Sequence, residues 1–386
     1  MKNKIYIISR FKKTGGAAIA ANRLYNTLSQ NKLIHLRYIF YDDNKNLYSF
    51  LKKKIFFILE YGLFRLLDKN VLRSINLFSL INIKNSIGDP SSIVNLHWFH
   101  SGLISLNRIK KIQNPLVLTL HDSWIVNKTS HYNTKFDFHK RNFFQSFIIK
   151  ILNHWTLKRK RKLNNIRCII SPSEWLKSLV IGDPHFSKFR VEVIPNPLDT
   201  NLFKPAENQN SSFNILIFFE SRFNVLKGGD LVFDFINSMN LDGNFDKKIN
   251  FSVVGNSISN KIDLPNVVNH GFINSERELV NIYQSSNICI SFSRSENLPQ
   301  FLTQAASCGL PLMGFDVDGI PEVVIDNYNG FLIKPYDINA YRKSFKNLIN
   351  NPKLMNEFSK NSRKIALKKW NQEIISNRYL EVFKSL

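Results

Sequence analysis

One stretch of the chain decides the class of fold: Ser295-Glu296-Asn297-Leu298-Pro299-Gln300-Phe301-Leu302-Thr303-Gln304-Ala305-Ala306-Ser307-Cys308-Gly309, which follows the apolar run Ile288 to Phe292. The order is that of a strand, a polar loop and a helix. Pro299 suits the first helical position because its missing N–H would have no partner there, and Gly309 suits a left-handed residue just past the helix end. The stretch therefore predicts one strand and one helix of an α/β sheet.

The loop and the first turn of that helix also have the properties of a ligand site. The first N–H groups of the helix, around Gln300 to Leu302, favour an anion such as a phosphate, and ligands of open α/β sheets gather at this strand edge. Glu296 lies in the loop, where it can accept hydrogen bonds from sugar hydroxyls, and Gln304 lies two turns along the helix. On pattern alone, an ordinary strand and helix with a solvated Glu296 explains the stretch equally well.

The rest of the chain repeats this alternation in two halves. Helical patterns separate most of the apolar runs, which predicts two doubly wound parallel sheets. The run Val191 to Asp199, a strand followed by a proline-rich connector, and the polar stretch Pro205 to Ser212 mark the boundary. We therefore expect domains at 1–200 and 201–365 and a closing helix at 366–386. The predicted strands are Ile5–Ser9, Leu36–Phe40, Ile93–Leu96, Leu116–Leu120, Cys168–Ile170 and Val191–Ile194, then Asn214–Phe219, Asn250–Val254, Val267–His270, Ile288–Phe292, Leu312–Phe315 and Phe331–Ile333.

Composition and length indicate a folded protein of two or three domains, with 386 residues, 44% hydrophobic and 21% charged. No 18 apolar residues run together, and the N-terminal apolar run is too short for a signal peptide. Cys168, Cys289 and Cys308 are widely spaced and predict buried thiols with no disulfide or metal role. We therefore expect a cytoplasmic protein without a membrane span.

Charge is concentrated in the first half of the chain. Residues 1–200 hold 33 Lys and Arg against 11 Asp and Glu, a net charge of +22, whereas residues 201–386 hold 20 against 18, a net charge of +2. Phe and Trp alternate with the cations between Lys135 and Lys162, which is typical of a helix that lies on an anionic membrane surface. Compositional drift toward Lys explains the excess almost as well, and nucleic acid is the weakest alternative because no nucleic-acid motif accompanies the charge.

Two candidate sites follow strands of the first half. Gly15 and Gly16 lie between the first strand and a helix, where a backbone without Cβ atoms can approach a phosphate. His121, followed by Asp122, ends the strand Leu116–Leu120 at the carboxyl edge, where it can bind a sugar hydroxyl. Taken alone, a glycine turn is a weak signal, and a hydrogen-bonded structural turn is the more frequent role of an isolated His-Asp pair.

The corresponding loop of the second half carries two cations, Arg222 and Lys227, before Gly228. An Arg with paired donors and a Lys as a point charge can clamp a diphosphate, although two ordinary surface cations fit the pattern equally well. Asp316 and Asp318 are spaced like metal ligands, but no third acidic residue is near, so no metal site is predicted.

The order of these signals along nearly the whole chain resembles the retaining GT-B glycosyltransferases of family 4. Within that family the chain is similar to bacterial enzymes of exopolysaccharide and lipopolysaccharide O-antigen synthesis, through Gly15 to Leu24 and Thr119 to Trp124. The resemblance rests on Gly15-Gly16, His121-Asp122, Pro172-Ser173-Glu174-Trp175, Ile194 to Asp199, Arg222 with Lys227-Gly228, Gly255, Gly271, Glu296 through Gln304-Ala305, and Gly319-Ile320-Pro321-Glu322.

The resemblance implies two Rossmann-like lobes that face each other across a cleft, with the last helix crossing back to the first lobe. The second lobe would bind the nucleotide sugar and the first the glycan acceptor, with no metal and no other cofactor. Transfer would keep the anomeric configuration. The implied catalytic residues are Glu296, which would bind the transferred sugar, His121, and the diphosphate ligands Arg222 and Lys227; the implied substrate-binding residues are Gly15, Gly16, Asn297, Leu298, Phe301, Gln304 and Gly319.

Two positions depart from the family pattern. Gln304 stands where a second glutamate usually binds the ribose, and Asp318 stands where a second glycine is common beside Gly319. Three hypotheses follow: a transferase that acts peripherally at the inner face of the cytoplasmic membrane on a lipid-linked glycan, a catalytically weak homologue that binds nucleotide sugar and scaffolds an assembly complex, and a basic nucleic-acid-binding protein. The resemblance favours the first, with no nucleic-acid partner.

Overall fold

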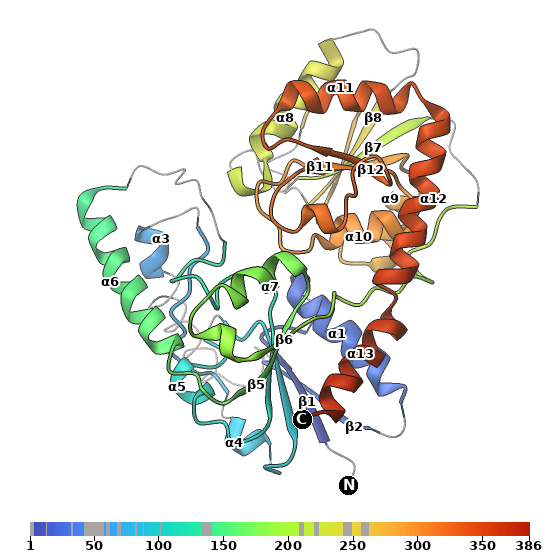
Figure 1. Cartoon of the computed structure of the whole chain (residues 1–386). Helices are drawn as coiled ribbons and strands as arrows, with labels where there is room; N and C mark the ends of the chain where they lie inside the picture. Colours follow the sequence, from blue (N-terminus) through green and yellow to red (C-terminus); the bar gives the residue numbers. More distant parts are fainter. Residues whose placement is uncertain are drawn as a thin grey trace. The chain divides into compact units, whose positions relative to one another are not determined.

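The computed structural model describes residues 4–12, 14–31, 34–41, 58, 62–67, 71–81, 83–87, 89–100, 102–132, 141–207, 212–219, 224–241, 249–255 and 262–386. The chain forms two compact units (Figure 1). Unit 1 comprises Met1–Pro197 and Gln372–Leu386, and unit 2 comprises Leu198–Asn371. Unit 1 resumes at Gln372, six residues after position 366, where the closing helix was expected to begin. The preceding helix (Pro352–Lys369) belongs to unit 2 because its C-cap residue, Trp370, is buried in the core of that unit.

Unit 1 is built on a six-stranded sheet in the order β2-β1-β3-β4-β5-β6, with every neighbouring pair parallel. Helices α1 (Gly16–Ser29) and α13 (Gln372–Lys384) pack on one face, and α5 (Leu106–Ile109) and α7 (Glu174–Ile181) on the other. The strands are β1 (Lys4–Ser9), β2 (His35–Phe40), β3 (Ile93–His97), β4 (Leu116–Thr119), β5 (Ile166–Ser171) and β6 (Arg190–Val193).

Unit 2 repeats the architecture with the order β12-β11-β10-β7-β8-β9, again all parallel. Helices α8 (Gly229–Leu241) and α11 (Ile338–Ile349) cover one face, α9 (Glu276–Gln284) and α10 (Gln300–Ser307) cover the other, and α12 (Pro352–Lys369) contributes to both apolar clusters. The strands are β7 (Phe213–Phe218), β8 (Ile249–Val254), β9 (Val267–Gly271), β10 (Ile288–Ile290), β11 (Leu312–Phe315) and β12 (Gly330–Ile333). All twelve predicted strands are confirmed, with shifts of one or two residues at some ends.

The layers follow from the period of two along a strand. In β1, Tyr6 and Ile8 enter the cluster under α5 and α7, whereas Ile5 and Ile7 enter the cluster under α1 and α13. Because helices cover both faces, the central strands are mainly apolar. The exceptions include Asn95 and His97 of β3 and Thr119 of β4, which are polar and buried.

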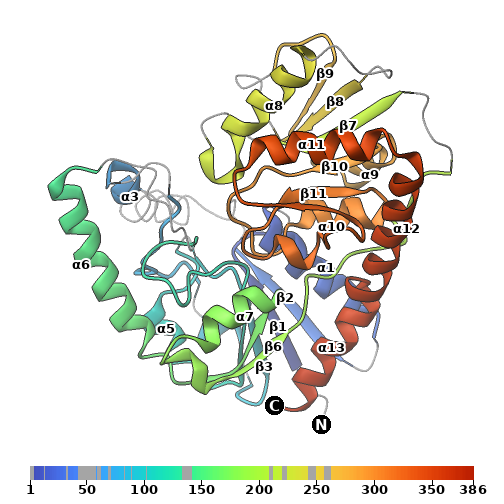
Figure 2. The same cartoon turned by 45° about the horizontal axis from the view of Figure 1, so that its top comes forward.

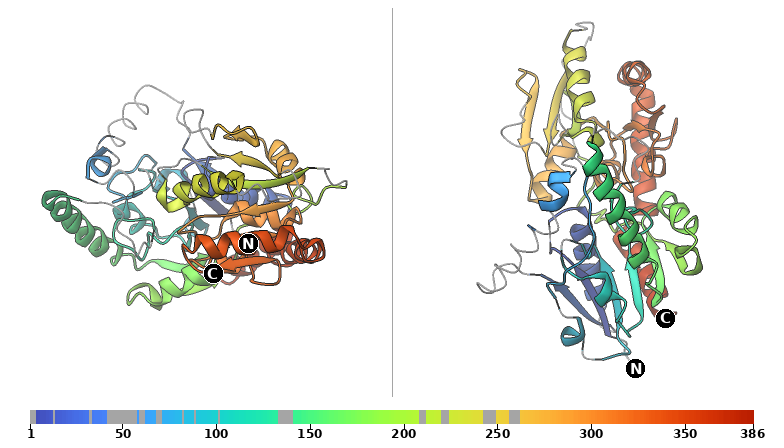
Figure 3. Two further views of the ribbon diagram at one scale, coloured as in Figure 1. Left: turned by 90° about the horizontal axis from the view of Figure 1, so that it is seen from above. Right: turned by 90° about the vertical axis from the view of Figure 1, so that its left-hand side faces the viewer.

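Helix α6 (Phe143–Lys160) is the one long helix of unit 1 that does not pack on the sheet clusters, among the residues that the structure describes. Figures 2 and 3 show it along the outside of unit 1, next to the short helix α3 (Leu63–Leu67). Its inner side joins a small separate cluster of Phe64, Leu67, Ile75 and Ile149. The remaining short elements are α4 (Ile83–Ser86), η2 (Phe186–Lys188), η3 (Val225–Lys227) and η5 (Ile320–Glu322).

Two further expectations concern the membrane and the cysteines. No helix among the described residues is both long and apolar enough to cross a membrane. Cys168, Cys289 and Cys308 are free and buried, as predicted.

Candidate active site

Two loops meet at the carboxyl edge of the sheet of unit 2, one after β7 and one after β10. Lys227 ends η3, and its Nζ donates to Oε1 of Glu296 at 2.6 Å. The Ser293 hydroxyl donates to the same carboxylate oxygen at 3.2 Å. The Lys227 and Glu296 side chains are 30% and 13% exposed, so a ligand can reach both. The residues assigned from the sequence to the diphosphate and to the sugar are therefore direct partners.

Arg294 holds the loop that carries Lys227. Its guanidinium donates to both carboxylate oxygens of Asp230 at 2.6 Å and to the carbonyl of Val225 at 2.6 Å, and its backbone N–H donates to Leu226 O at 2.8 Å. Burial raises the pKa of Asp230, but the hydrogen bonds and charge of Arg294 outweigh burial, so this pKa lies below its ordinary value. A paired Arg–carboxylate contact of this kind is geometrically specific. Sequence reasoning missed Arg294, although a cation two residues before Glu296 was a visible signal.

Two glycines allow the backbones around Glu296 to touch. Gly228 has φ +69°, and a Cβ built on it would lie 2.0 Å from the carbonyl oxygen of Phe292. A Cβ on Gly319 would lie 1.6 Å from the carbonyl oxygen of Asn297, and the Gly319 N–H donates to Glu296 O at 2.9 Å. No side chain fits at either position without moving the loop that carries Glu296. Gly319, predicted as substrate-binding, thus supports the backbone of Glu296 itself.

Asp318 takes a conformation that usually selects glycine or asparagine. Its φ is +49°, and the Ser295 hydroxyl donates to its Oδ2 at 2.5 Å. That hydrogen bond comes from the loop of Glu296, so Asp318 adds a side-chain link to the contact made by Gly319.

Helix α10 begins one residue later than predicted: Pro299 is the N-cap, and Gln300 is the first helical residue. Gly309 has the predicted left-handed backbone, with φ +74°. The side chain of Leu298 is buried in the apolar cluster, and the Phe301 ring lies 4.9 Å from the Phe218 ring.

The Gln304 side chain is buried on α10 and already has a partner. Its Oε1 lies 3.0 Å from the hydroxyl of Tyr283 on α9, which is also 3.0 Å from the carbonyl of Phe301. Gln304 is therefore part of the packing between two helices as well as a candidate ligand residue. Arg222, the other predicted diphosphate ligand, lies outside the described residues.

At the carboxyl edge of unit 1, Gly15 forms the predicted turn before α1. Its φ of 84° and ψ of 155° are accessible only to glycine, and no atom beyond its own chain neighbours lies within 4 Å of the position of a Cβ. Gly16 is the first residue of α1. Open space beside an exposed glycine backbone is what the close approach of a phosphate requires.

His121 follows β4 at the same edge, as predicted. Its Nε2 lies 3.1 Å from Nδ1 of His97, the last residue of β3. Burial lowers the pKa of His121 to about 4 and the pKa of His97 well below its ordinary value, so both rings are neutral near pH 7. Sequence reasoning missed His97, although the alternation Asn95-Leu96-His97 puts two polar residues on one face of a buried strand.

His100, Asp122 and His131 form a second group of polar side chains in unit 1. Burial raises the pKa of Asp122, but the charge and hydrogen bond of His131 outweigh burial and bring this pKa below its ordinary value. His131 Nδ1 lies 2.7 Å from Asp122 Oδ2, and the potential ligand atoms of His100, Asp122 and His131 lie within 4.8 Å of one another. That spacing suits a metal ion, yet His131 Nε2 lies 2.8 Å from the Ser74 hydroxyl and His100 Nδ1 lies 3.0 Å from the side-chain oxygen Oδ1 of Asn76. The group is thus closed by hydrogen bonds of its own.

Lys160, the last residue of α6, holds the loop that follows Asp122 through hydrogen bonds to its backbone. Its side chain is fully buried, and Nζ donates to the carbonyls of Trp124, Asn127 and Lys128 and lies 3.4 Å from the centre of the Trp124 ring. Burial holds the pKa of this amine well below its ordinary value. Lys160 therefore anchors the loop that follows His121 and Asp122.

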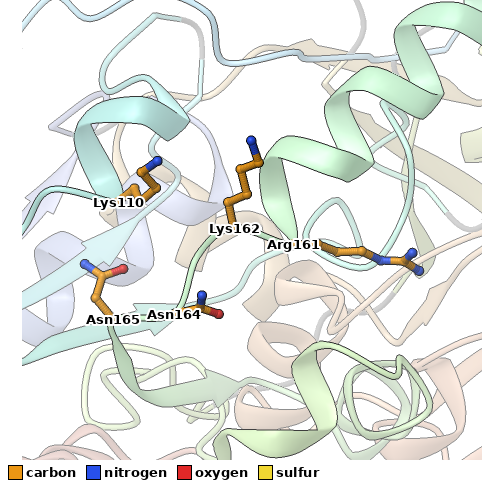
Figure 4. A pocket seen from close by; sticks show the side chains of 5 residues that line it. All are labelled: Lys110, Arg161, Lys162, Asn164 and Asn165. Atoms are coloured by element: carbon orange, nitrogen blue, oxygen red, sulfur yellow. The ribbon is translucent and has the colours of Figure 1, made fainter.

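The other cations at this end of α6 line a surface pocket of about 580 Å³ with Lys110, Asn164 and Asn165. Figure 4 shows that the Arg161 and Lys162 side chains point in different directions. Lys110 and Arg161 are the C-caps of α5 and α6, where positive charge stabilises the negative end of a helix dipole. The pocket is a diffuse positive surface, with no shared point to which its cations converge.

Comparison with known proteins agrees with this geometry. Residues 15–202 match the family Glycosyltransferase Family 4, and residues 202–365 match Glycosyl transferases group 1. The chain belongs to the family 4 glycosyltransferases of the GT-B fold. It is a glycosyltransferase.

Two relatives match the chain over long segments. The chain is 24% identical over 302 residues to an uncharacterized 41.2 kDa protein in the cps region of Klebsiella pneumoniae, covering 68% of this chain and 82% of the relative. It is 23% identical over 209 residues to the UDP-Gal:alpha-D-GlcNAc-diphosphoundecaprenol alpha-1,3-galactosyltransferase of Escherichia coli, covering 48% of this chain and 52% of the relative.

Solved structures share the fold at low identity. Sucrose-phosphate synthase from Thermosynechococcus elongatus is similar with a TM-score of 0.70 and 17% identity, covering 100% of this chain and 99% of that chain. Anabaena HepE in complex with UDP and glucose is similar with a TM-score of 0.64 and 15% identity, covering 100% of both chains. The predicted GT-B architecture is thus confirmed.

Proposed function

We propose that the protein is a retaining glycosyltransferase that moves a sugar from a nucleotide-sugar donor to a growing, lipid-linked cell-surface glycan, in polysaccharide or O-antigen biosynthesis. The observation that carries the proposal is the 2.6 Å ion pair between Lys227 and Glu296. A carboxylate accepts hydrogen bonds from sugar hydroxyls, and an ammonium group binds phosphate. The pair lies at the strand edge where α/β sheets bind nucleotides, so one site can bind both the sugar and the diphosphate of the donor.

The relatives suggest the substrates. HepE was solved with UDP and glucose, and the E. coli relative is named for UDP-Gal and a diphosphoundecaprenol acceptor. The K. pneumoniae relative is encoded in a cps region. We therefore propose a UDP-sugar donor and an acceptor sugar carried on a polyprenyl diphosphate.

The proposed reaction needs positive charge at the leaving group. The bond from the anomeric carbon to the donor phosphate breaks, a bond to the acceptor oxygen forms on the same face, and the leaving phosphate takes the acceptor proton. Negative charge develops on the diphosphate, where Lys227 would neutralise it together with Arg222. Because side chains supply this charge, we propose a metal-independent reaction, and transfer in the presence of EDTA should equal transfer without it.

The site is tested by separating sugar binding from nucleotide binding. Glu296→Gln removes the charge and keeps the shape, so it should abolish the extra thermal stabilisation that a UDP-sugar gives over UDP. Lys227→Ala should weaken the stabilisation by both ligands. Glu357→Gln and Lys353→Ala, on the exposed side of α12, are matched controls. Undiminished sugar transfer by Glu296→Gln would refute the role of Glu296.

The basic first half supports action at the anionic inner face of the cytoplasmic membrane, through α6. Phe143 and Phe147 are 88% and 53% exposed, and Ile151 and Trp155 continue the stripe at intervals of four residues. No Asp or Glu occurs in α6. Apolar side chains that enter the lipid interface and cations that contribute about 1 kcal/mol each near an anionic surface act together.

Vesicle sedimentation tests the membrane contact. Phe143→Ser combined with Phe147→Ser should abolish binding to vesicles that contain anionic phosphatidylglycerol, while Ile181→Ser, at an equally exposed position on α7, should not change it. Binding should also fall in high salt. Equal sedimentation of the double variant and the wild type would refute the α6 contact.

A second candidate function, a catalytically weak homologue that acts as a scaffold, is favoured only by Gln304. Its neutral amide binds a ribose less strongly than a carboxylate, and its Oε1 is already used by Tyr283. Gln304→Glu keeps an acceptor for the Tyr283 hydroxyl, so the fold should tolerate it. A sharp rise in turnover would support the scaffold; little change would support a competent enzyme.

A further inference from the structure

The sheet of unit 1 contains a continuous line of polar side chains inside an apolar layer. Thr119, Asn95 and His97 are buried on the face covered by α1 and α13, beside Val117 and Ile375. Polar groups in such a layer cost folding free energy unless each one is hydrogen-bonded. The line ends at His121, which lies beyond the last residue of β4.

The hydrogen bonds of this line have a direction. The Thr119 hydroxyl donates to Asn95 Oδ1 at 2.8 Å, and the amide nitrogen of Asn95 faces His97 Nε2 at 2.9 Å. Because an amide nitrogen only donates, His97 Nε2 must accept. The proton of neutral His97 is then on Nδ1, which donates to His121 Nε2 at 3.1 Å. Tyr379 of α13, hydrogen-bonded to the Thr119 hydroxyl, begins the line.

The donor-to-acceptor order of these hydrogen bonds determines whether His121 presents a donor or an acceptor to a ligand. Its Nε2 is occupied as an acceptor inside the protein, so the neutral ring carries its proton on Nδ1. Among the described residues, the hydrogen bond of the His121 ring is the one at Nε2, which leaves Nδ1 to a ligand. Burial lowers the pKa of His121 to about 4 and keeps the ring uncharged.

We propose that Thr119, Asn95 and His97 are positioning residues that hold His121 in the Nδ1–H tautomer, so that His121 meets its ligand as a neutral hydrogen-bond donor. The inference rests on the proposed function, in which that ligand is an oxygen of the donor sugar or the acceptor. A donor suits a reaction in which the leaving phosphate takes the proton, because His121 then has no free basic nitrogen to act as a general base.

The tautomer can be measured without any substrate. Long-range ¹H–¹⁵N spectra of the full chain labelled at histidine distinguish Nδ1–H from Nε2–H rings, and the His121 and His97 signals are assigned from their loss in His121→Asn and His97→Phe. We expect the Nδ1–H pattern at His121. An Nε2–H pattern in the wild type would overturn the proposal, even if sugar transfer is intact.

Asn95→Asp reverses the line with almost no change in shape. A carboxylate only accepts, so neutral His97 donates to it from Nε2–H; His97 Nδ1 then accepts, and His121 donates to it from Nε2–H. His121 would change to the Nε2–H tautomer and present an acceptor to its ligand. Because His121 then faces, as an acceptor, an oxygen that it binds as a donor in the wild type, kcat/KM for transfer should fall about 10- to 100-fold.

The control is His185→Gln, which removes a histidine of unit 1 that bonds Leu163 O and lies outside the line. It should leave the His121 tautomer and the transfer rate unchanged. A folded Asn95→Asp protein with an unchanged His121 tautomer would overturn the proposal. Absence of sugar transfer by the wild type would instead refute the proposed function and leave the tautomer result standing.

Discussion

Gly228→Ala should destabilise the protein more than an alanine at another left-handed glycine, because Gly228 has two constraints. Its φ is +69°, and a Cβ would lie 2.0 Å from the carbonyl oxygen of Phe292. Gly255 has φ +97°, but its nearest neighbour would be 3.7 Å away. Both variants therefore place a side chain on a left-handed backbone, but only in Gly228→Ala does the new Cβ overlap with a neighbouring atom.

The magnitudes follow from these two terms. A residue with a side chain in a left-handed conformation costs about 1–3 kcal/mol, and this cost applies to both variants. At Gly228 the loops must also separate by at least 1 Å to reach the 3.0 Å that real contacts allow. Forcing extra atoms into a packed site costs about 1–3 kcal/mol more. Gly228→Ala should thus lose about 1–3 kcal/mol more free energy of unfolding than Gly255→Ala.

Urea denaturation of the full chain measures this difference, and hydrogen exchange locates it. The loop after β10 should exchange faster in Gly228→Ala, because moving Phe292 disturbs the backbone that leads to Glu296. Equal losses in the two variants, within about 0.5 kcal/mol, would refute the reasoning. So would unchanged exchange at residues 291–298.

Three other variants or conditions test the remaining buried polar groups. Folding lowers the pKa of His121 from 6.5 to about 4, so the unfolded chain binds more protons than the folded chain between these pH values. The free energy of unfolding should therefore fall by roughly 3 kcal/mol between pH 6.5 and pH 4. His97 and His100 act in the same direction, and a free energy of unfolding that stays constant across a pH series of melts would contradict this. Lys160→Met leaves three carbonyls without their donor and should cost about 2–4 kcal/mol in denaturation, whereas exposed Lys158→Met should cost less than about 0.5. Arg294→Lys loses the paired contact with Asp230 and should lower kcat/KM for transfer about tenfold with the fold retained; an unchanged rate would show that the clamp does not position Lys227.

Much of the fold could be predicted because burial leaves a local pattern. Most of the twelve strands are short, mainly apolar runs, since both faces of a parallel sheet are covered, and helices fall between most of them. Residues at strand ends were also predictable: Glu296, Lys227, His121 and Gly15 lie at carboxyl edges, as the order of strands and loops indicated.

The partners of those residues were not predictable from the sequence. Lys227 and Glu296 are 69 positions apart, and their contact depends on the Arg294–Asp230 clamp and on two glycines that let loops touch. The line from Thr119 through Asn95 and His97 crosses two strands, and its direction depends on which way one buried amide points. Periodicity records whether a residue is buried, but it does not record which side chain from another strand lies opposite.

The sequence by itself determined the class of protein, the positions of the strands and the candidate residues at their ends, because local periodicity and glycine or proline placement are enough for these. Only the tertiary structure decided how the candidates are connected. In the tertiary structure Lys227 donates to Glu296, Gln304 is buried and hydrogen-bonded to Tyr283, and Nε2 of His121 is hydrogen-bonded to His97. The physical reason is that hydrogen bonds and ion pairs need contact within about 3 Å, and contact between distant segments is set by the packing of the whole sheet.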